Sequence, residues 1–149
     1  MRVGALIAIA LMAGAGSAGA QDKQVIAGPG APSGRPYSPA VRVGNLLFLS
    51  GHVGVDPDTR QLAPGGIEAE TRQALENIKA LLESAGSSLD RVVKCTVFLG
   101  DIQYYAAMNR VYASYFPKDP PARSAVGVGG LPIGAAVEIE CIALAGDAK

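Results

Sequence analysis

Short runs of apolar and β-branched residues, some with polar residues at alternate positions, predict five β-strands in the chain. Two of them form a hairpin over residues 40–51, because Gly44-Asn45 can turn the chain between two apolar segments. The other three strands are expected at 91–99, 122–128 and 136–145. The residues before the hairpin, from Gln21 to Pro39, are rich in Gly and Pro and predict an irregular arm.

Two further segments repeat apolar residues every three or four positions, which predicts amphipathic helices. The first spans 67–85, and Gly86 suits the position just after its last turn. The second follows a cap at Asp101 and runs to about Phe116. The order β-β-α-β-α-β-β predicts an α+β sandwich, with two helices packed on one face of a single mixed sheet. The last strand is apolar on both faces, so we expect self-association to cover the second face.

The first twenty residues have the pattern of a secretory signal peptide. Arg2 precedes an apolar stretch, and Ala18-Gly19-Ala20 fits the small residues before a cleavage site. We therefore predict a signal peptide at 1–20, a single domain at 21–149, and a periplasmic or secreted mature protein with no membrane association. The alternatives are an uncleaved anchor or a wrongly assigned start codon.

Charge and cysteine content narrow the possible classes of protein. The chain has 13 basic and 13 acidic residues, so no excess of positive charge favours nucleic acid or an anionic membrane. Two cysteines and one histidine are too few for a closed zinc site, and no metal is expected. Cys95 and Cys141 could form a disulfide in an exported protein. We favour two buried free thiols, because nothing in their spacing brings them together.

Arg123 stands early in an apolar stretch that carries no further charge until Glu138. A guanidinium in such surroundings needs an anionic partner, and a small carboxylate ligand would fit it with two parallel hydrogen bonds. The alternative is an Arg that extends to the surface or pairs with a structural acid. Glu138, expected opposite Arg123, could hold this Arg or orient a water molecule for attack. Glu140 is interpreted as a solvated edge residue.

Residues of the hairpin form a second group of interest. Ser50 and His52 are expected to share one face of its second strand. This spacing does not place an imidazole behind a hydroxyl, so Ser50 is interpreted as a hydrogen-bond donor to a ligand rather than a nucleophile. His52 is interpreted as a pocket or surface residue. Tyr37, in the loop before the hairpin, could cover a pocket or pack on the core.

The segment from Pro120 onward resembles the signature of the RidA/YjgF family of small imine deaminases. The matching pieces are Pro-Ala-Arg at 121–123, Leu131-Pro132, and Val-Glu-Ile at 137–139, in the run PPARSAVGVGGLPIGAAVEIECIA. The segments PYSPAVRVGNLLFLSGHVGVDPDT and TRQALENIKALLESAGSSLDRVVKCTVFLGDIQYYAAMNRVYASYF are similar to the family's hairpin and to its helices and third strand. The resemblance covers residues 25–145.

This resemblance implies a chorismate-mutase-like fold and a homotrimer with sites in the clefts between subunits. It implies hydrolysis of 2-enamine or 2-imine acids, of the 2-aminoacrylate type, to 2-keto acids and ammonia, without a cofactor or metal. The family's carboxylate-binding Arg corresponds to Arg123 and its water-orienting Glu to Glu138. Its other substrate-binding positions correspond to four residues of this chain: Tyr37, Ser50, Gly51 and Asn109.

The chain departs from the family pattern at three positions near these residues. His52 stands where Gln is common, Ala125 where Cys is frequent, and Gly127 where Glu is frequent. The substrate range is therefore open. Three alternatives remain: a non-catalytic metabolite-binding trimer, a ribonuclease or translation inhibitor, and a structural or chaperone-like trimer. The neutral charge disfavours the ribonuclease.

Overall fold

The computed structural model describes residues 22–29, 34 and 36–146, and the predicted signal peptide at 1–20 lies outside them. Two α-helices and seven strands make up most of the described chain. The helices are α1 (Ile67–Ser84) and α2 (Tyr105–Tyr115). The strands are β1 (Lys23–Ile26), β2 (Ala40–Val43), β3 (Leu46–Leu49), β4 (His52–Val53), β5 (Val92–Leu99), β6 (Ala122–Gly127) and β7 (Val137–Leu144). Single 3-10 turns lie at Leu89–Arg91, Ile102–Tyr104 and Pro132–Gly134.

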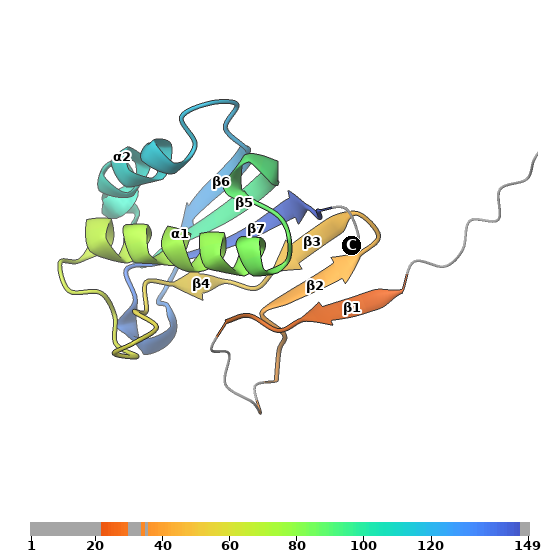
Figure 1. The fold of residues 1–149 in the computed structure, drawn as a ribbon. Coiled ribbons are helices and arrows are strands. Elements are labelled where there is room, and N and C mark those ends of the chain that lie inside the picture. The colour runs from red at the N-terminus through yellow and green to blue at the C-terminus, as the bar shows by residue number, and fades with distance from the viewer. Residues whose placement is uncertain (1–21, 30–33, 35, 147–149) are drawn as a thin grey trace, which may run out of the picture.

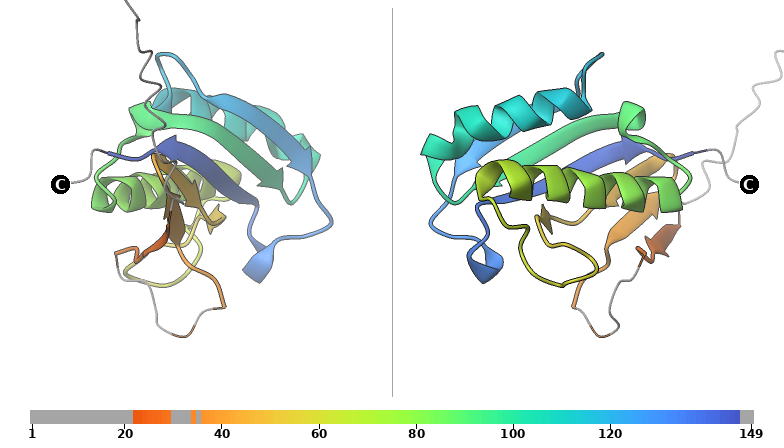
Figure 2. Two further views of the ribbon diagram at one scale, coloured as in Figure 1. Left: turned by 90° about the vertical axis from the view of Figure 1, so that its right-hand side faces the viewer. Right: turned by 60° about the vertical axis from the view of Figure 1, so that its left-hand side comes forward.

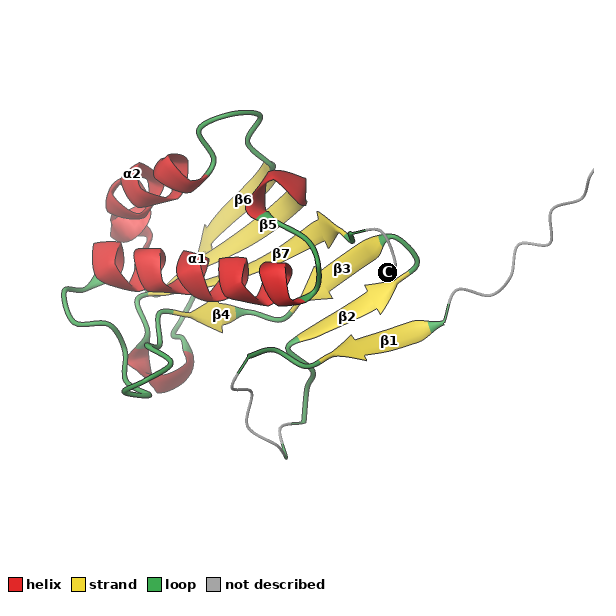
Figure 3. Ribbon diagram, in the orientation of Figure 1, coloured by secondary structure: helices red, strands yellow, loops and turns green. Residues whose placement is uncertain are grey.

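All seven strands belong to one sheet, shown in yellow in Figure 3. Its order is β1-β2-β3-β7-β5-β6, and β4 pairs with β7 beyond the end of β3. Every pairing is antiparallel except that of β5 with β6, which is parallel. The predicted single mixed sheet is confirmed.

Both helices lie on the same side of this sheet, as the views in Figures 1 and 2 show. The core forms between them because alternate residues of each strand point toward the helices. In β7, Val137, Ile139 and Cys141 are buried on this side, whereas Glu138 and Glu140 point to the other. The helix α1 contributes a buried stripe at the spacing its pattern predicts: Ala74, Leu75, Ile78, Leu81 and Leu82. The predicted α+β arrangement with two helices on one face is therefore correct.

The second face of the sheet, which we call the open face, carries no helix in the described chain. Four large apolar side chains are exposed on the strands: Val25 on β1, Phe48 on β3, Val93 on β5 and Val126 on β6. Water contact with side chains of this size is unfavourable, and such a surface is typical of a protein interaction site.

Two local features differ from the sequence prediction. The arm before the hairpin is not wholly irregular, because Lys23–Ile26 pairs with β2 as an edge strand. The second strand of the hairpin is interrupted: Phe48 pairs with Ile142, but His52 pairs with Ile139, so one extra residue lies between β3 and β4. This is a β-bulge at Ser50 and Gly51.

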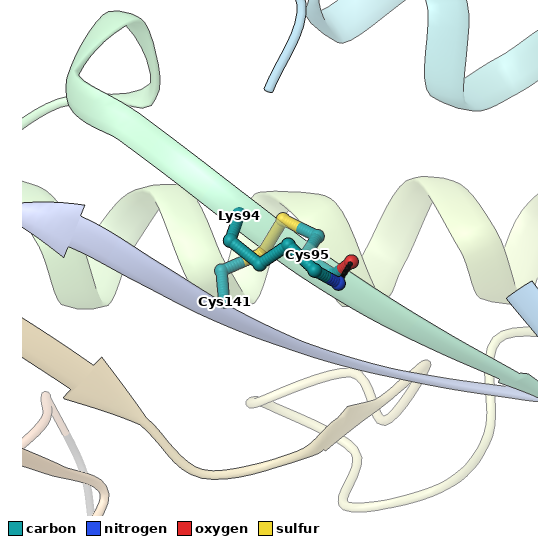
Figure 4. Close-up of a disulfide and its surroundings, with 3 residues drawn as sticks. All are labelled: Lys94, Cys95 and Cys141. Carbon is teal, nitrogen blue, oxygen red and sulfur yellow. Dashed lines mark hydrogen bonds between the residues drawn. A yellow bond between two sulfur atoms is a disulfide. The ribbon is translucent and has the colours of Figure 1, made fainter. Parts of the chain in front are cut away.

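The cysteines also differ from the prediction, since Cys95 and Cys141 form a disulfide (Figure 4). Their expected state as free thiols is wrong. They are direct partners in the β5–β7 register, with Cα atoms 4.1 Å apart, and both side chains face the core. Residues that are far apart in sequence become neighbours only through strand pairing, which their spacing along the chain does not reveal.

Candidate functional site

Arg123 lies on β6 and points toward α2, on the helix-covered side of the sheet. Its Nη2 atom donates one hydrogen bond to Asn109 Oδ1, at 2.7 Å, and one to the hydroxyl oxygen of Tyr105, at 3.3 Å. The remaining donors, on Nε and Nη1, make no hydrogen bond to any described residue. No described acid pairs with Arg123, so the structural alternative of an Arg–acid pair is not found within the described chain.

Aromatic rings of α2 hold the cation in place. The guanidinium carbon of Arg123 lies 4.5 Å from the ring centre of Tyr112 and 5.7 Å from that of Tyr105. A cation over an aromatic face is attracted by the negative charge of that face. The Tyr112 hydroxyl is buried and has no hydrogen-bond partner in the described part of the chain. Burial raises the pKa of Tyr112 to about 12, and the charge of Arg123 acts in the opposite direction.

The resemblance to the family placed Asn109 in the site, whereas Tyr105 and Tyr112 were not among the expected site residues. A helical spacing could have found them, because residues four and seven positions apart share one face of a helix. Tyr105, Asn109 and Tyr112 follow this spacing and all contact Arg123. The structure therefore shows Asn109 as a residue that orients Arg123.

Glu138 lies on β7 and is half-buried on the open face. Its carboxylate covers Gly51 so closely that a Cβ atom at residue 51 would overlap it. Burial raises the pKa of Glu138, and the negative charge of Glu140 raises it further. Such a carboxyl group takes up a proton more readily than an ordinary Glu, which suits a group that accepts and returns protons during a reaction.

Arg123 and Glu138 lie on opposite faces of the sheet, so the expectation that they face one another across neighbouring strands is wrong within one chain. Arg123 is the β6 partner of Cys95, whereas Glu138 is the β7 partner of Phe98. Because Cys95 and Phe98 are three residues apart on β5, their side chains point to opposite faces. A site that contains both groups requires residues from two copies of the chain.

The hairpin residues are separated in the same way. Ser50 donates its hydroxyl hydrogen to the carbonyl oxygen of Ser38, at 2.7 Å. His52 pairs with Ile139 and takes the helix-covered face, so the bulge removes it from the face that was expected to hold both residues. Tyr37 is 53% exposed and does not belong to the hydrophobic core, so of the two interpretations left open for it, packing on the core is not observed.

The positions that depart from the family pattern are partly explained by packing. Ala125 packs against the core cluster beside β5. At Gly127, a Cβ atom would come within 3.1 Å of the Ile102 side chain, which occupies the space that a larger residue would need. The absence of a side chain at Gly127 therefore leaves room for the side chain of Ile102 in the same chain.

A shallow hollow of about 200 Å³ opens beside the bridged strands. Its lining includes Lys94, Thr96 and Glu140 of the open face, but neither Arg123 nor Glu138. Across the described residues, no group of three or more His, Cys, Asp or Glu side chains is arranged to hold a metal ion. A search of the same residues finds no helix that is long and apolar enough to cross a membrane.

A family model described as Endoribonuclease L-PSP matches residues 29–145. The chain belongs to this family, the RidA/YjgF family. Among its relatives, the 2-iminobutanoate/2-iminopropanoate deaminase of Mus musculus is 46% identical over 111 residues, which are 74% of this chain and 82% of the mouse protein. A RutC family protein of Pyrococcus horikoshii is 52% identical over 108 residues, covering 72% of this chain and 86% of the archaeal one.

Solved structures of RidA/YjgF proteins share the fold. The crystal structure of RidA from an Antarctic Psychrobacter species superposes with a TM-score of 0.72 at 44% identity, covering 83% of this chain and 98% of that one. The YjgF gene product of E. coli has a TM-score of 0.74 at 38% identity and covers 81% and 98%. The family and its α+β fold were both predicted from the sequence.

Proposed function

We propose that the protein is an imine deaminase that hydrolyses small 2-imino acids to 2-keto acids and ammonia. The observation that carries this proposal is the state of Arg123. Its guanidinium is held by Asn109 and by the ring of Tyr112, yet it has no acidic partner in the described chain. A fixed cation with spare donors is suited to a carboxylate ligand. Relatives named 2-iminobutanoate/2-iminopropanoate deaminase, among them the mouse protein, act on substrates that carry such a group.

In the proposed reaction, an enamine first tautomerises to its imine. Arg123 binds the carboxylate and fixes the position of the adjacent C=N carbon. Glu138 accepts a proton from a water molecule as the water oxygen forms a bond to that carbon, and it then gives this proton to the nitrogen, which has taken up the C=N electron pair. In the second step, the ionised Glu138 accepts the hydroxyl proton of the carbinolamine as the C=O bond forms, and it passes this proton to the nitrogen, so that the C–N bond breaks and ammonia leaves. The raised pKa of Glu138 suits both transfers.

The reaction requires little chemical activation, which agrees with the few groups that the proposed site provides. Imines already hydrolyse in water, so the protein needs to supply positioning and one proton-transfer group rather than a strong nucleophile. Ser50, Gly51, Tyr37 and Asn109 are proposed to surround the substrate or to orient Arg123.

We propose further that the active form is a homotrimer, with each site in a cleft between neighbouring subunits. Arg123 and Glu138 lie on opposite faces of one sheet, so a second copy must supply one of them. The exposed apolar residues of the open face, such as Phe48 and Val126, provide a surface for that association. The trimer would bury this surface and complete the site together.

An exported location is proposed from the N-terminal sequence, and the disulfide supports it. Disulfides persist in oxidising compartments and are rare in the cytosol. The imine substrate would then come from a reaction outside the cytoplasm that oxidises an amine or an amino acid. A ribonuclease, the activity named in the description of the family, is the second candidate, and the chain's balanced charge disfavours it.

The proposal is tested by measuring hydrolysis of imines generated in the cuvette by an amino-acid oxidase. We expect faster release of keto acid with the mature protein than without it, and no acceleration with Arg123→Ala. The matched control is Arg110→Ala, because Arg110 is an exposed Arg whose partner is Glu68 at the surface. Full activity of Arg123→Ala, or acceleration by neither wild type nor control, would refute the proposal. Cleavage of RNA under the same conditions would favour the second candidate.

A further inference from the structure

The hydrogen bonds of Arg123 identify a residue of the site that neither the motif nor the mapped positions include. Nη2 carries two hydrogens and donates two hydrogen bonds, to Asn109 Oδ1 and to the Tyr105 hydroxyl oxygen. A guanidinium can hold a carboxylate with two parallel hydrogen bonds along either of two edges, and each edge includes one Nη2 hydrogen. A carboxylate bound in this way must therefore displace one of the two residues.

The two contacts differ in strength, which decides the residue that yields. The bond to Asn109 Oδ1 is short, at 2.7 Å, whereas the bond to the Tyr105 hydroxyl is 3.3 Å and lies beyond the usual range. Tyr105 is also 43% exposed and is the first residue of α2, so its ring is free to adjust at the rim of the site. Tyr105 therefore yields to the ligand, and Asn109 keeps its hold on Arg123.

We propose that Tyr105 is a substrate-binding residue whose hydroxyl oxygen occupies the place of a substrate carboxylate oxygen on Arg123. When the ligand binds, its carboxylate oxygen accepts the Nη2 hydrogen, and the displaced hydroxyl donates its own hydrogen to the same oxygen. A carboxylate oxygen has enough lone pairs to accept both bonds. This inference rests on the proposed function and adds a residue to the same site.

The arrangement also favours one chemical class of ligand. Arg123 and the reoriented Tyr105 both present hydrogen-bond donors, which suit the acceptor-only oxygens of a carboxylate. A primary amide would turn donor hydrogens toward the same donors and leave them unpaired, a mismatch that sites use to reject analogues. The site is therefore selective for free 2-imino and 2-keto acids over their amides, and Tyr105 contributes to that selection.

The test compares binding of 2-oxobutanoate, the keto acid expected from 2-iminobutanoate, to wild type and two variants by calorimetry. Tyr105→Phe keeps the ring and removes the hydroxyl, and we expect about a tenfold rise in Kd, because a hydrogen bond to a charged group is lost. The matched control is Tyr104→Phe, since Tyr104 is equally aromatic, exposed, and makes no contact with Arg123. Its Kd should stay within about twofold of wild type, the scatter of surface substitutions.

Turnover gives an independent readout of the same contact. Because the carboxylate contact exists before and during the reaction, Tyr105→Phe should raise KM about tenfold with kcat nearly unchanged. Unchanged or tighter binding by Tyr105→Phe, or an equal loss in Tyr104→Phe, overturns the role of Tyr105. The proposed function is judged separately, by whether wild type turns over imines and Arg123→Ala does not. A wild type that turns over imines but fails to bind 2-oxobutanoate overturns the role of Tyr105 and leaves the proposed function standing.

Discussion

The disulfide between Cys95 and Cys141 should supply a large share of the protein's stability. The perturbation is complete reduction of the wild-type protein in denaturant, followed by refolding with the reductant still present. The bridge closes a loop with a sequence separation of 46 residues. The chain-entropy relation for cross-links gives about 4 kcal/mol for a loop of this length at 25 °C.

Burial of both cysteines simplifies the comparison between the oxidised and the reduced protein. Cys95 is 0% and Cys141 is 2% exposed, so the thiols that reduction produces lie in the core, and the chain-entropy relation attributes the loss of stability mainly to the freer unfolded chain. The free energy of unfolding of an ordinary domain is about 5–15 kcal/mol, so such a loss is a large fraction of it. We therefore expect reduction to lower the midpoint of unfolding markedly.

The assay is urea unfolding of oxidised and reduced protein at one protomer concentration, because association shifts apparent stability. The control is the double variant Cys95→Ala/Cys141→Ala, which has no bridge and should unfold at the same urea concentration with and without reductant. Coinciding midpoints for oxidised and reduced wild type would refute the reasoning. So would a response of the control variant to reductant.

The remaining predictions concern the site. Gly51→Ala should lower kcat/KM about a hundredfold in steady-state assays, because the new Cβ atom would displace the Glu138 carboxylate and small misplacements are costly; near-normal activity would contradict this. The value of kcat/KM should fall as pH drops through the raised pKa of Glu138. Glu140→Gln should move this fall to lower pH, because it removes the neighbouring negative charge that raises the pKa of Glu138. A fall at the same pH in Glu140→Gln would exclude Glu140 as a cause of the raised pKa. The raised pKa of Glu138 means that folding disfavours its ionised form, so Glu138→Gln should increase the free energy of unfolding at neutral pH. This gain should vanish below the ordinary pKa of Glu, where Glu138 is protonated in both the folded and the unfolded protein. Tyr112→Phe should raise the free energy of unfolding by about 1 kcal/mol, because it removes a buried hydroxyl with no described partner. Tyr112→Ala should lower the free energy of unfolding by about 3–5 kcal/mol, because the buried ring is lost. Similar urea midpoints for both variants would contradict the account.

Much of the fold could be predicted because its periodicities are local. The apolar stripe of α1 and the alternation of β7 depend on residues a few positions apart, and both appear in the structure where they were expected. The cap at Asp101 is equally local: its side chain accepts a hydrogen bond from the backbone N–H of Gln103, at 2.9 Å, in the turn before α2. The short strand β1 was missed because its stability comes from pairing with β2 rather than from its own composition.

The site was harder to predict because its geometry depends on register. The disulfide exists because β5 and β7 align Cys95 with Cys141, and no feature of the sequence near either cysteine fixes that alignment. A single extra residue at the bulge separates His52 from the face of Ser50, because the side-chain period of a strand is two. The same alternation of side chains places Arg123 and Glu138 on opposite faces of the sheet. A sequence motif that includes both residues does not reveal this arrangement.

The most direct test of the account is to mix two inactive variants. Arg123→Ala and Glu138→Gln, co-expressed with different tags and purified together, would share each intersubunit site in the proposed closed ring. Purification through both tags in turn keeps only rings that hold both variants, and one of the three sites in each such ring combines an intact Arg123 from one subunit with an intact Glu138 from its neighbour, so activity should recover to about a third of wild type. If the mixed protein stays as inactive as either variant alone, the two groups do not act across a subunit boundary, and the central claim is wrong.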